Sequence, residues 1–200
     1  MTAQYQASEI KHFHTNSDME LLAEACPDIT RMIFKYNPHF FTNYIQLAMF
    51  EKLTHFETWG GEYWQSGLGQ LLEILGSNLI ALHLCHVEEI SEDSLIHITS
   101  HCVRLNTLVF ENCSFLENEE LTEEEQEIKE FKVPLMLDLK KLRVINFMST
   151  RMIQMILKKA INISTIEIDS ENEFTDETVA LVMQSNKLAK LEDFLIYSSK

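Results

Sequence analysis

Five side chains of the kinds that bind metals lie in two groups in the first half of the chain. His83, Cys85 and His86 lie within four residues of one another, and His55 and Glu57 form a second group upstream. Imidazole, thiolate and carboxylate groups are the ligands that zinc accepts in proteins. A thiol beside an imidazole is also the arrangement that activates a cysteine nucleophile. The residue types therefore allow two chemistries, metal binding and nucleophilic catalysis.

The spacing of these residues favours neither chemistry. The chain has no C-x-x-C pair, which many structural zinc sites use. His97 and His101 are one helical turn apart, but the glutamate of the metalloprotease pattern H-E-x-x-H is missing. Neither a glycine-rich phosphate loop nor a G-x-S-x-G motif occurs. We therefore expect a protein that is not an enzyme and that needs no cofactor or metal.

A repeat sets the positions of these residues. Residues 102–113 contain the spacing L-x-x-L-x-L-x-x-C at Leu105, Leu108, Phe110 and Cys113. This spacing is the strand-and-turn pattern of a leucine-rich repeat. Six further copies fit the same three main positions: Ile29, Met32 and Phe34; Leu53, Phe56 and Thr58; Leu79, Leu82 and Leu84; Leu142, Ile145 and Phe147; Ile163, Ile166 and Ile168; and Leu191, Phe194 and Ile196.

Seven copies in order predict an α/β fold of the leucine-rich repeat type. We expect a curved solenoid of about seven irregular repeats, with a parallel β-sheet on the concave face and helices on the convex face. Residues 1–18 form a poorly patterned N-terminal segment, and residues 19–200 form the repeat domain. Cys26, Cys102 and Cys113 fall on repeat positions, so we expect reduced thiols packed as small apolar groups.

The cysteine three residues before the first leucine resembles the repeat of F-box proteins of the leucine-rich class, whose solenoid is similar to that of ribonuclease inhibitor. The resemblance implies a protein-binding domain that holds substrates for a cullin-based ubiquitin ligase, and hence ubiquitin-dependent protein degradation. An F-box would precede the repeats as a three-helix segment, and residues 1–18 lack that pattern. Three hypotheses follow: the substrate-recognition part of such an adaptor, or a fragment of one; a free-standing interaction scaffold; and, against the expectation above, a metal-binding or thiol enzyme.

An acidic insertion at residues 114–135 interrupts the array. Eight glutamates and one lysine between Glu117 and Glu130 supply nearly half of the net charge of -15. Thr122 and Glu125 have the spacing of a capping box, which predicts a short exposed helix. The insertion is either a solvated loop or an acidic docking segment for a basic partner. The absence of clustered lysine and arginine argues against nucleic acid as a partner.

Localisation is predicted from two absences in the sequence. No run of 18 apolar residues occurs, and the first residues lack the pattern of a signal peptide. We therefore expect no membrane association and a cytoplasmic protein, with the nucleus as an alternative.

The predicted partner surface is the concave face, because the repeat's apolar positions point inward and the alternate strand residues point outward. The column between the second and third apolar positions comprises Ile33, Glu57, His83, Val109, Asn146, Glu167 and Leu195. The next column comprises Lys35, Trp59, Cys85, Glu111, Met148, Asp169 and Tyr197. The residues that we expect to contact a protein partner are Tyr36, Glu57, Trp59, His83, Glu111, Met148, Asp169 and Tyr197. Self-association through the strand that begins near Leu191 is a further expectation, because that edge would be open.

Overall fold

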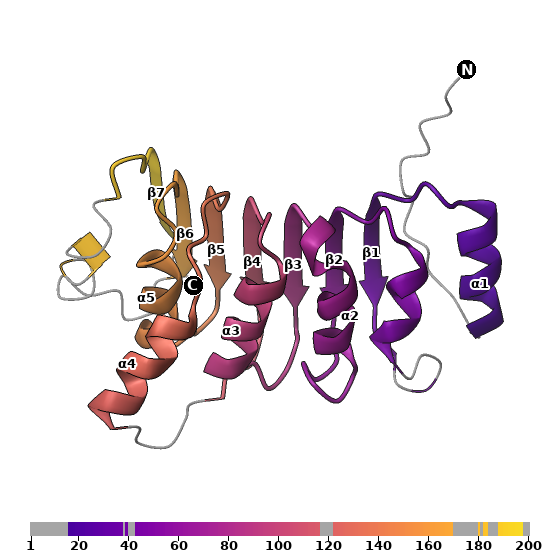
Figure 1. Cartoon of the computed structure of the whole chain (residues 1–200), viewed down its shortest axis with the longest axis horizontal. Helices are drawn as coiled ribbons and strands as arrows, with labels where there is room; N and C mark the ends of the chain where they lie inside the picture. Colours follow the sequence, from indigo (N-terminus) through magenta and orange to yellow (C-terminus); the bar gives the residue numbers. More distant parts are fainter. Residues whose placement is uncertain are drawn as a thin grey trace.

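Seven parallel strands form one sheet in the part of the chain that the structure describes. The computed structural model describes residues 16–37, 39, 43–116, 122–169, 180, 182–183 and 188–197, so most of the predicted segment 1–18 lies outside it. The strands follow one another in chain order across the sheet (Figure 1). They are β1 (Arg31–Lys35), β2 (His55–Trp59), β3 (Ala81–Cys85), β4 (Thr107–Glu111), β5 (Lys141–Ile145), β6 (Thr165–Asp169) and β7 (Asp193–Tyr197).

Helices connect the strands and cover one side of the sheet. The α-helices of the described segments are α1 (Asn16–Ala25), α2 (Leu68–Leu75), α3 (Glu92–His101), α4 (Glu123–Lys132) and α5 (Thr150–Leu157), and the 3-10 helices are η1 (Tyr44–Met49) and η2 (Gly76–Asn78). In Figure 1, α2, α3 and α5 lie in front of the row of strands. We call the side with the helices the helix face and the opposite side of the sheet the sheet face. This arrangement confirms the predicted leucine-rich repeat solenoid.

The core forms because buried and exposed side chains alternate along the strands. In β1 the second and fourth residues are buried and the other three are exposed, and β2 and β5 repeat this pattern with half-buried residues in place of the exposed ones. Side chains of a strand point to opposite faces in turn, so each repeat directs two of them toward the helices. Leu82, Leu84, Leu108 and Phe110 are fully buried there. Burial of each such side chain contributes about 1.5–3 kcal/mol.

One core position is occupied by a threonine, Thr58, whose hydroxyl group has a hydrogen-bond partner. Thr58 takes the third main position of its repeat and is fully buried. Its hydroxyl forms a hydrogen bond with the hydroxyl of Tyr44, which also donates to the carbonyl of Gly60 at 2.8 Å. A buried hydroxyl without a partner would be costly, so Tyr44 allows threonine to replace an apolar residue.

Each of the strands β2 to β5 is followed by a residue with left-handed backbone conformation. Gly60, His86, Asn112 and Asn146 come directly after these strands and have φ values of 83°, 51°, 53° and 77°. Glycine adopts this conformation without steric cost, and asparagine tolerates it better than most residues. Glycine thus allows the turn after Trp59, and the repeats of β3, β4 and β5 use the same conformation without glycine.

The prediction for the fifth repeat was wrong by three residues. Leu142 pairs with Leu108, which holds the second main position of its repeat, so Leu139 holds the first. We expected Ile145 and Phe147 to point inward. Instead, Ile145 is half-buried and Phe147 is 45% exposed. Two overlapping L-x-x-[LI] spacings occur here, and the insertion removes the repeat length that would have distinguished them.

The acidic insertion contains the helix that the sequence predicts. The side chain of Thr122 accepts a hydrogen bond from the amide of Glu125, and the Glu125 carboxylate accepts one from the Thr122 amide, so the capping box is confirmed. Lys129 of α4 lies 3.2 Å from the Asp93 carboxylate of α3. Phe131 on the same helix is 85% exposed. Helix α4 thus has an ion pair with the neighbouring repeat and carries an uncovered aromatic ring.

All four cysteines are free thiols, and three of them are buried. Cys102 and Cys113 are packed as expected, whereas Cys26 is exposed, so the prediction of a packed Cys26 was wrong. The Sγ atom of Cys102 lies beneath Gly76 of the preceding repeat, 2.9 Å from where a Cβ atom on that glycine would stand. Among the described residues, no earlier repeat lies against Cys26 in the same way.

Strand β7 forms one edge of the described sheet and pairs with β6. All five of its residues are exposed. Phe194 and Ile196 occupy the positions that are buried in the central repeats, yet they are 41% and 60% exposed. These two residues are thus more exposed than their counterparts in the central repeats.

Candidate functional site

The sheet face presents one column of side chains from the middle of the strands and a second from their last residues. Strand register assigns one column to Ile33, Glu57, His83, Val109, Arg143, Glu167 and Leu195. The second column contains Lys35, Trp59, Cys85, Glu111, Ile145, Asp169 and Tyr197. Arg143 and Ile145 replace the predicted Asn146 and Met148, because the fifth repeat begins three residues earlier than expected. Met148 is fully buried, so its prediction as a contact residue was wrong.

An imidazole between two carboxylates forms the centre of this face. The Nδ1 atom of His83 lies 3.3 Å from the Glu57 carboxylate, and its Nε2 atom lies 3.3 Å from the Glu111 carboxylate. The three residues stand on β2, β3 and β4, and each side chain is about one quarter exposed. Because parallel strands lie about 4.8 Å apart, side chains on the same face of neighbouring strands can meet in this way. The row is partly open to solvent and carries an acidic group at each end.

Trp59 lies beside this row and is held by three neighbours. Its indole N–H donates a hydrogen bond to Glu57 at 2.7 Å. The ammonium group of Lys35 lies 5.3 Å from the ring centroid, and the His86 ring lies 5.6 Å away. A cation at this distance from an indole ring is attracted to it. The ring is therefore oriented by contacts on the sheet face and remains half-buried.

Three other predicted contact residues differ in accessibility. Tyr36 is half-buried and stacks on Tyr44, with ring centroids 5.0 Å apart, so part of its ring belongs to the core. Asp169 is only 3% exposed, which makes it a poor contact residue despite its column. Tyr197 is 41% exposed on β7. The burial of Tyr36 and Asp169 was not foreseen, because a strand pattern gives the side of the sheet and not the size of the neighbouring side chains.

Basic side chains dominate the sheet face at β5. Arg143 lies 3.3 Å from the carboxylate of Glu167, and Lys141 forms an ion pair with the same group. Glu167 is buried, whereas the two basic side chains are just over one third exposed. The acidic row from β2 to β4 is thus followed by cationic groups on the next strand. The sequence pattern missed Arg143 because its repeat was placed in the wrong register.

The thiol of Cys85 is unsuited to nucleophilic attack. It is fully buried, and its Sγ atom lies 3.0 Å from Nε2 of His83. Burial, followed by the nearby carboxylates of Glu111 and Glu57, raises the pKa of Cys85 to about 12. The thiolate is the reactive form of cysteine, so its population near neutral pH is very small.

Two groups of metal-ligand type occur among the described residues. Glu57, His83 and Cys85 have donor atoms within 4.8 Å of one another on the sheet face. Metal binding there would have to displace the proton of the buried Cys85 thiol, whose pKa is raised to about 12. The second group, Glu73, His97 and His101, lies on the helix face. The sequence pattern missed Glu73 because it belongs to a different repeat from the two histidines.

None of the described helices is long and apolar enough to span a membrane.

The comparisons with known proteins concern the repeat domain. No curated protein matched the chain. The family model described as At1g61320/AtMIF1, LRR domain, matches residues 71–199, more than half of the chain. The chain therefore belongs to this leucine-rich repeat family.

Proposed function

We propose that this chain is a non-enzymatic module that binds a protein partner on its sheet face. Its membership of a leucine-rich repeat family supports a role in protein interaction. The observation that carries the proposal is the half-open row of Glu57, His83 and Glu111, with Trp59 beside it. An oriented tryptophan beside polar groups is typical of the energetically important part of an interface. The partly exposed carboxylates fit a partner that presents lysine or arginine.

A finer proposal concerns the process in which the module acts. The cysteine-containing repeats resemble those of F-box proteins, which supports a substrate-recognition part of a ubiquitin ligase adaptor in the cytoplasm or nucleus. Ligase subunits would then join through an F-box upstream in a longer product. The alternative is a free-standing scaffold, and the exposed Phe194 and Ile196 of β7 favour self-association in that case.

Matched double variants test which surface binds the partner. The first variant combines Trp59→Ala with Glu111→Lys on the sheet face. The second combines Phe131→Ala with Glu127→Lys on α4, so each variant removes one aromatic ring and reverses one charge. Quantitative mass spectrometry of proteins captured from cell extract by each form is the measurement. We expect the specific partners to be lost with the first variant and kept with the second.

The opposite result would assign binding to the acidic insertion and overturn the proposal. Equal loss in both variants would also overturn it, provided that circular dichroism shows both to be folded.

The mass of the endogenous protein tests the finer proposal. An antibody against residues 117–131 is used to compare it with the 23.3 kDa of this chain. A larger product that co-purifies with cullin subunits is the result expected for a ligase adaptor. A product of 23.3 kDa that elutes as a dimer would favour the scaffold.

A further inference from the structure

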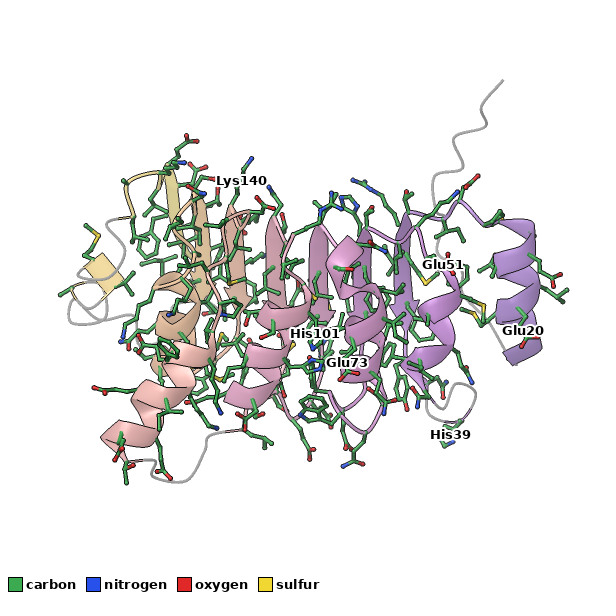
Figure 2. All side chains as sticks on the ribbon, viewed as in Figure 1. Glu20, His39, Glu51, Glu73, His101 and Lys140 are labelled. Carbon is green, nitrogen blue, oxygen red and sulfur yellow. The ribbon has the colours of Figure 1, made fainter. Side chains whose placement is uncertain are left out.

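Three metal-ligand side chains meet on the helix face, away from the proposed partner surface. His97 and His101 lie one turn apart on α3, and Glu73 comes from the neighbouring α2. One donor atom of each residue lies within 4.8 Å of the other two. Figure 2 shows Glu73 and His101 close together where α2 and α3 lie side by side. The carboxylate that the sequence lacks between the two histidines is thus supplied by another helix.

Contacts on both sides orient the ring of His97. Its Nε2 atom lies 3.0 Å from the Glu73 carboxylate, and its Nδ1 atom lies 3.0 Å from the Tyr63 hydroxyl. The ring of Trp64 meets it edge to face, with centroids 4.8 Å apart. When Nδ1–H donates to the Tyr63 oxygen, Nε2 carries the lone pair that a metal requires. Such a second hydrogen bond is the usual device that fixes a metal-binding histidine.

Packing holds Tyr63 in place beside His97. Tyr63 is fully buried, and its ring meets that of Trp64 edge to face, with centroids 4.9 Å apart. Its hydroxyl oxygen therefore has a fixed position from which it can accept a hydrogen bond from the His97 ring. Only 13% of the His97 side chain is exposed, whereas 51% of Glu73 is exposed. The group is consequently rigid on its inner side and open to solvent on its outer side.

The donor set indicates which ion would bind. Two imidazoles with one carboxylate form a set that zinc uses in catalytic sites, with a further position left for water. The centroids of the His97 and His101 rings are 4.5 Å apart, and one nitrogen of each ring lies within 4.8 Å of the other and of a Glu73 oxygen. One divalent cation can therefore contact all three residues. Magnesium and calcium prefer oxygen ligands and do not fit two imidazoles.

We propose that Glu73, His97 and His101 form a binding site for a divalent transition-metal ion of the zinc type, with Tyr63 positioning His97. The ion links α2 and α3, which belong to consecutive repeats, and therefore strengthens the junction between them. Because the ion binds the folded form, the melting temperature rises with zinc concentration.

Titration calorimetry of the chelator-treated full chain with zinc chloride tests the site. We expect one zinc ion per chain and no heat with magnesium chloride. Glu73→Gln keeps the size of a half-exposed side chain, and His101→Ala removes a ligand at the end of α3; each is expected to weaken zinc binding by more than about 100-fold. Tyr63→Phe is expected to weaken it by about 10- to 100-fold through the lost hydrogen bond to His97.

His83→Ala on the sheet face is the matched control, and its zinc affinity should equal that of the unmodified chain. Absence of zinc binding by the unmodified chain would overturn the proposal. An unchanged affinity in both Glu73→Gln and His101→Ala would also overturn it, as would a loss of binding in His83→Ala alone. Circular dichroism identifies any variant that fails to fold, and Glu73→Gln remains decisive if His101→Ala does not fold.

Discussion

Two histidine clusters occupy opposite sides of the same part of the array, and they are built in different ways. On the sheet face, His83 lies between Glu57 and Glu111, because strand alternation places the three side chains on one side of neighbouring strands. On the helix face, Glu73 and His97 meet because α2 packs against α3. On the sheet face the third donor near His83 is the buried thiol of Cys85, whereas on the helix face all three donors are imidazole or carboxylate groups. The row of charged groups therefore fits the proposed partner protein, and the second group fits the proposed ion.

The largest expected effect is a loss of stability in the core beneath both clusters. Phe110 of β4 is fully buried, and Phe110→Ala leaves a cavity in the core that the two clusters share. We expect a loss of about 3–5 kcal/mol in the free energy of unfolding. Urea unfolding followed by circular dichroism measures it. Phe131→Ala is the control, since that ring is 85% exposed, and an equal loss there would contradict a shared core.

A smaller loss of stability is expected for His97→Ala, and it should exceed that for His83→Ala. His97→Ala removes the partner of the buried Tyr63 hydroxyl, so we expect a loss of about 1–3 kcal/mol in the free energy of unfolding. Chemical unfolding in the presence of chelator makes the measurement independent of metal. Tyr63→Phe combined with His97→Ala should cost less than the sum of the single losses. Full additivity would show that the two side chains do not interact.

His83→Ala is expected to have little effect on stability. Its side chain is one quarter exposed and its partners are carboxylates near solvent, so we expect less than about 1 kcal/mol. The same unfolding measurement applies, with His97→Ala alongside it. A larger loss for His83→Ala than for His97→Ala would reverse the comparison between the faces.

Because of the buried thiols, we expect the free energy of unfolding to depend on pH in alkaline solution. Burial raises the pKa of Cys102 to about 12 and that of Cys113 to about 11, and burial with nearby carboxylates raises that of Cys85 to about 12. Above about pH 9 the unfolded thiols lose protons that the folded thiols retain, so the free energy of unfolding falls as the pH rises. Unfolding at about pH 8 and about pH 10 measures this slope. Cys102→Ala should make the slope smaller, and an unchanged slope would contradict the assignment.

The apolar spacing of the repeat predicted most of the fold. The positions Leu82, Leu84, Leu108 and Phe110 are buried as expected, because the strand period of two is explicit in the sequence. The error at Leu142 arose where an insertion removed the regular repeat length. The family match and the sheet agree with the predicted solenoid. The F-box relationship and the partner residues other than Met148 stay predictions.

Local spacing determined which residues lie on the sheet face, since β-strand alternation depends only on neighbours in the chain. The apolar pattern by itself assigned Glu57, His83 and Glu111 to that face. Tertiary structure alone decided that Met148 is buried and that Glu73 reaches His97. The physical reason is that packing between helices depends on residues from different repeats, whose distances no local pattern contains.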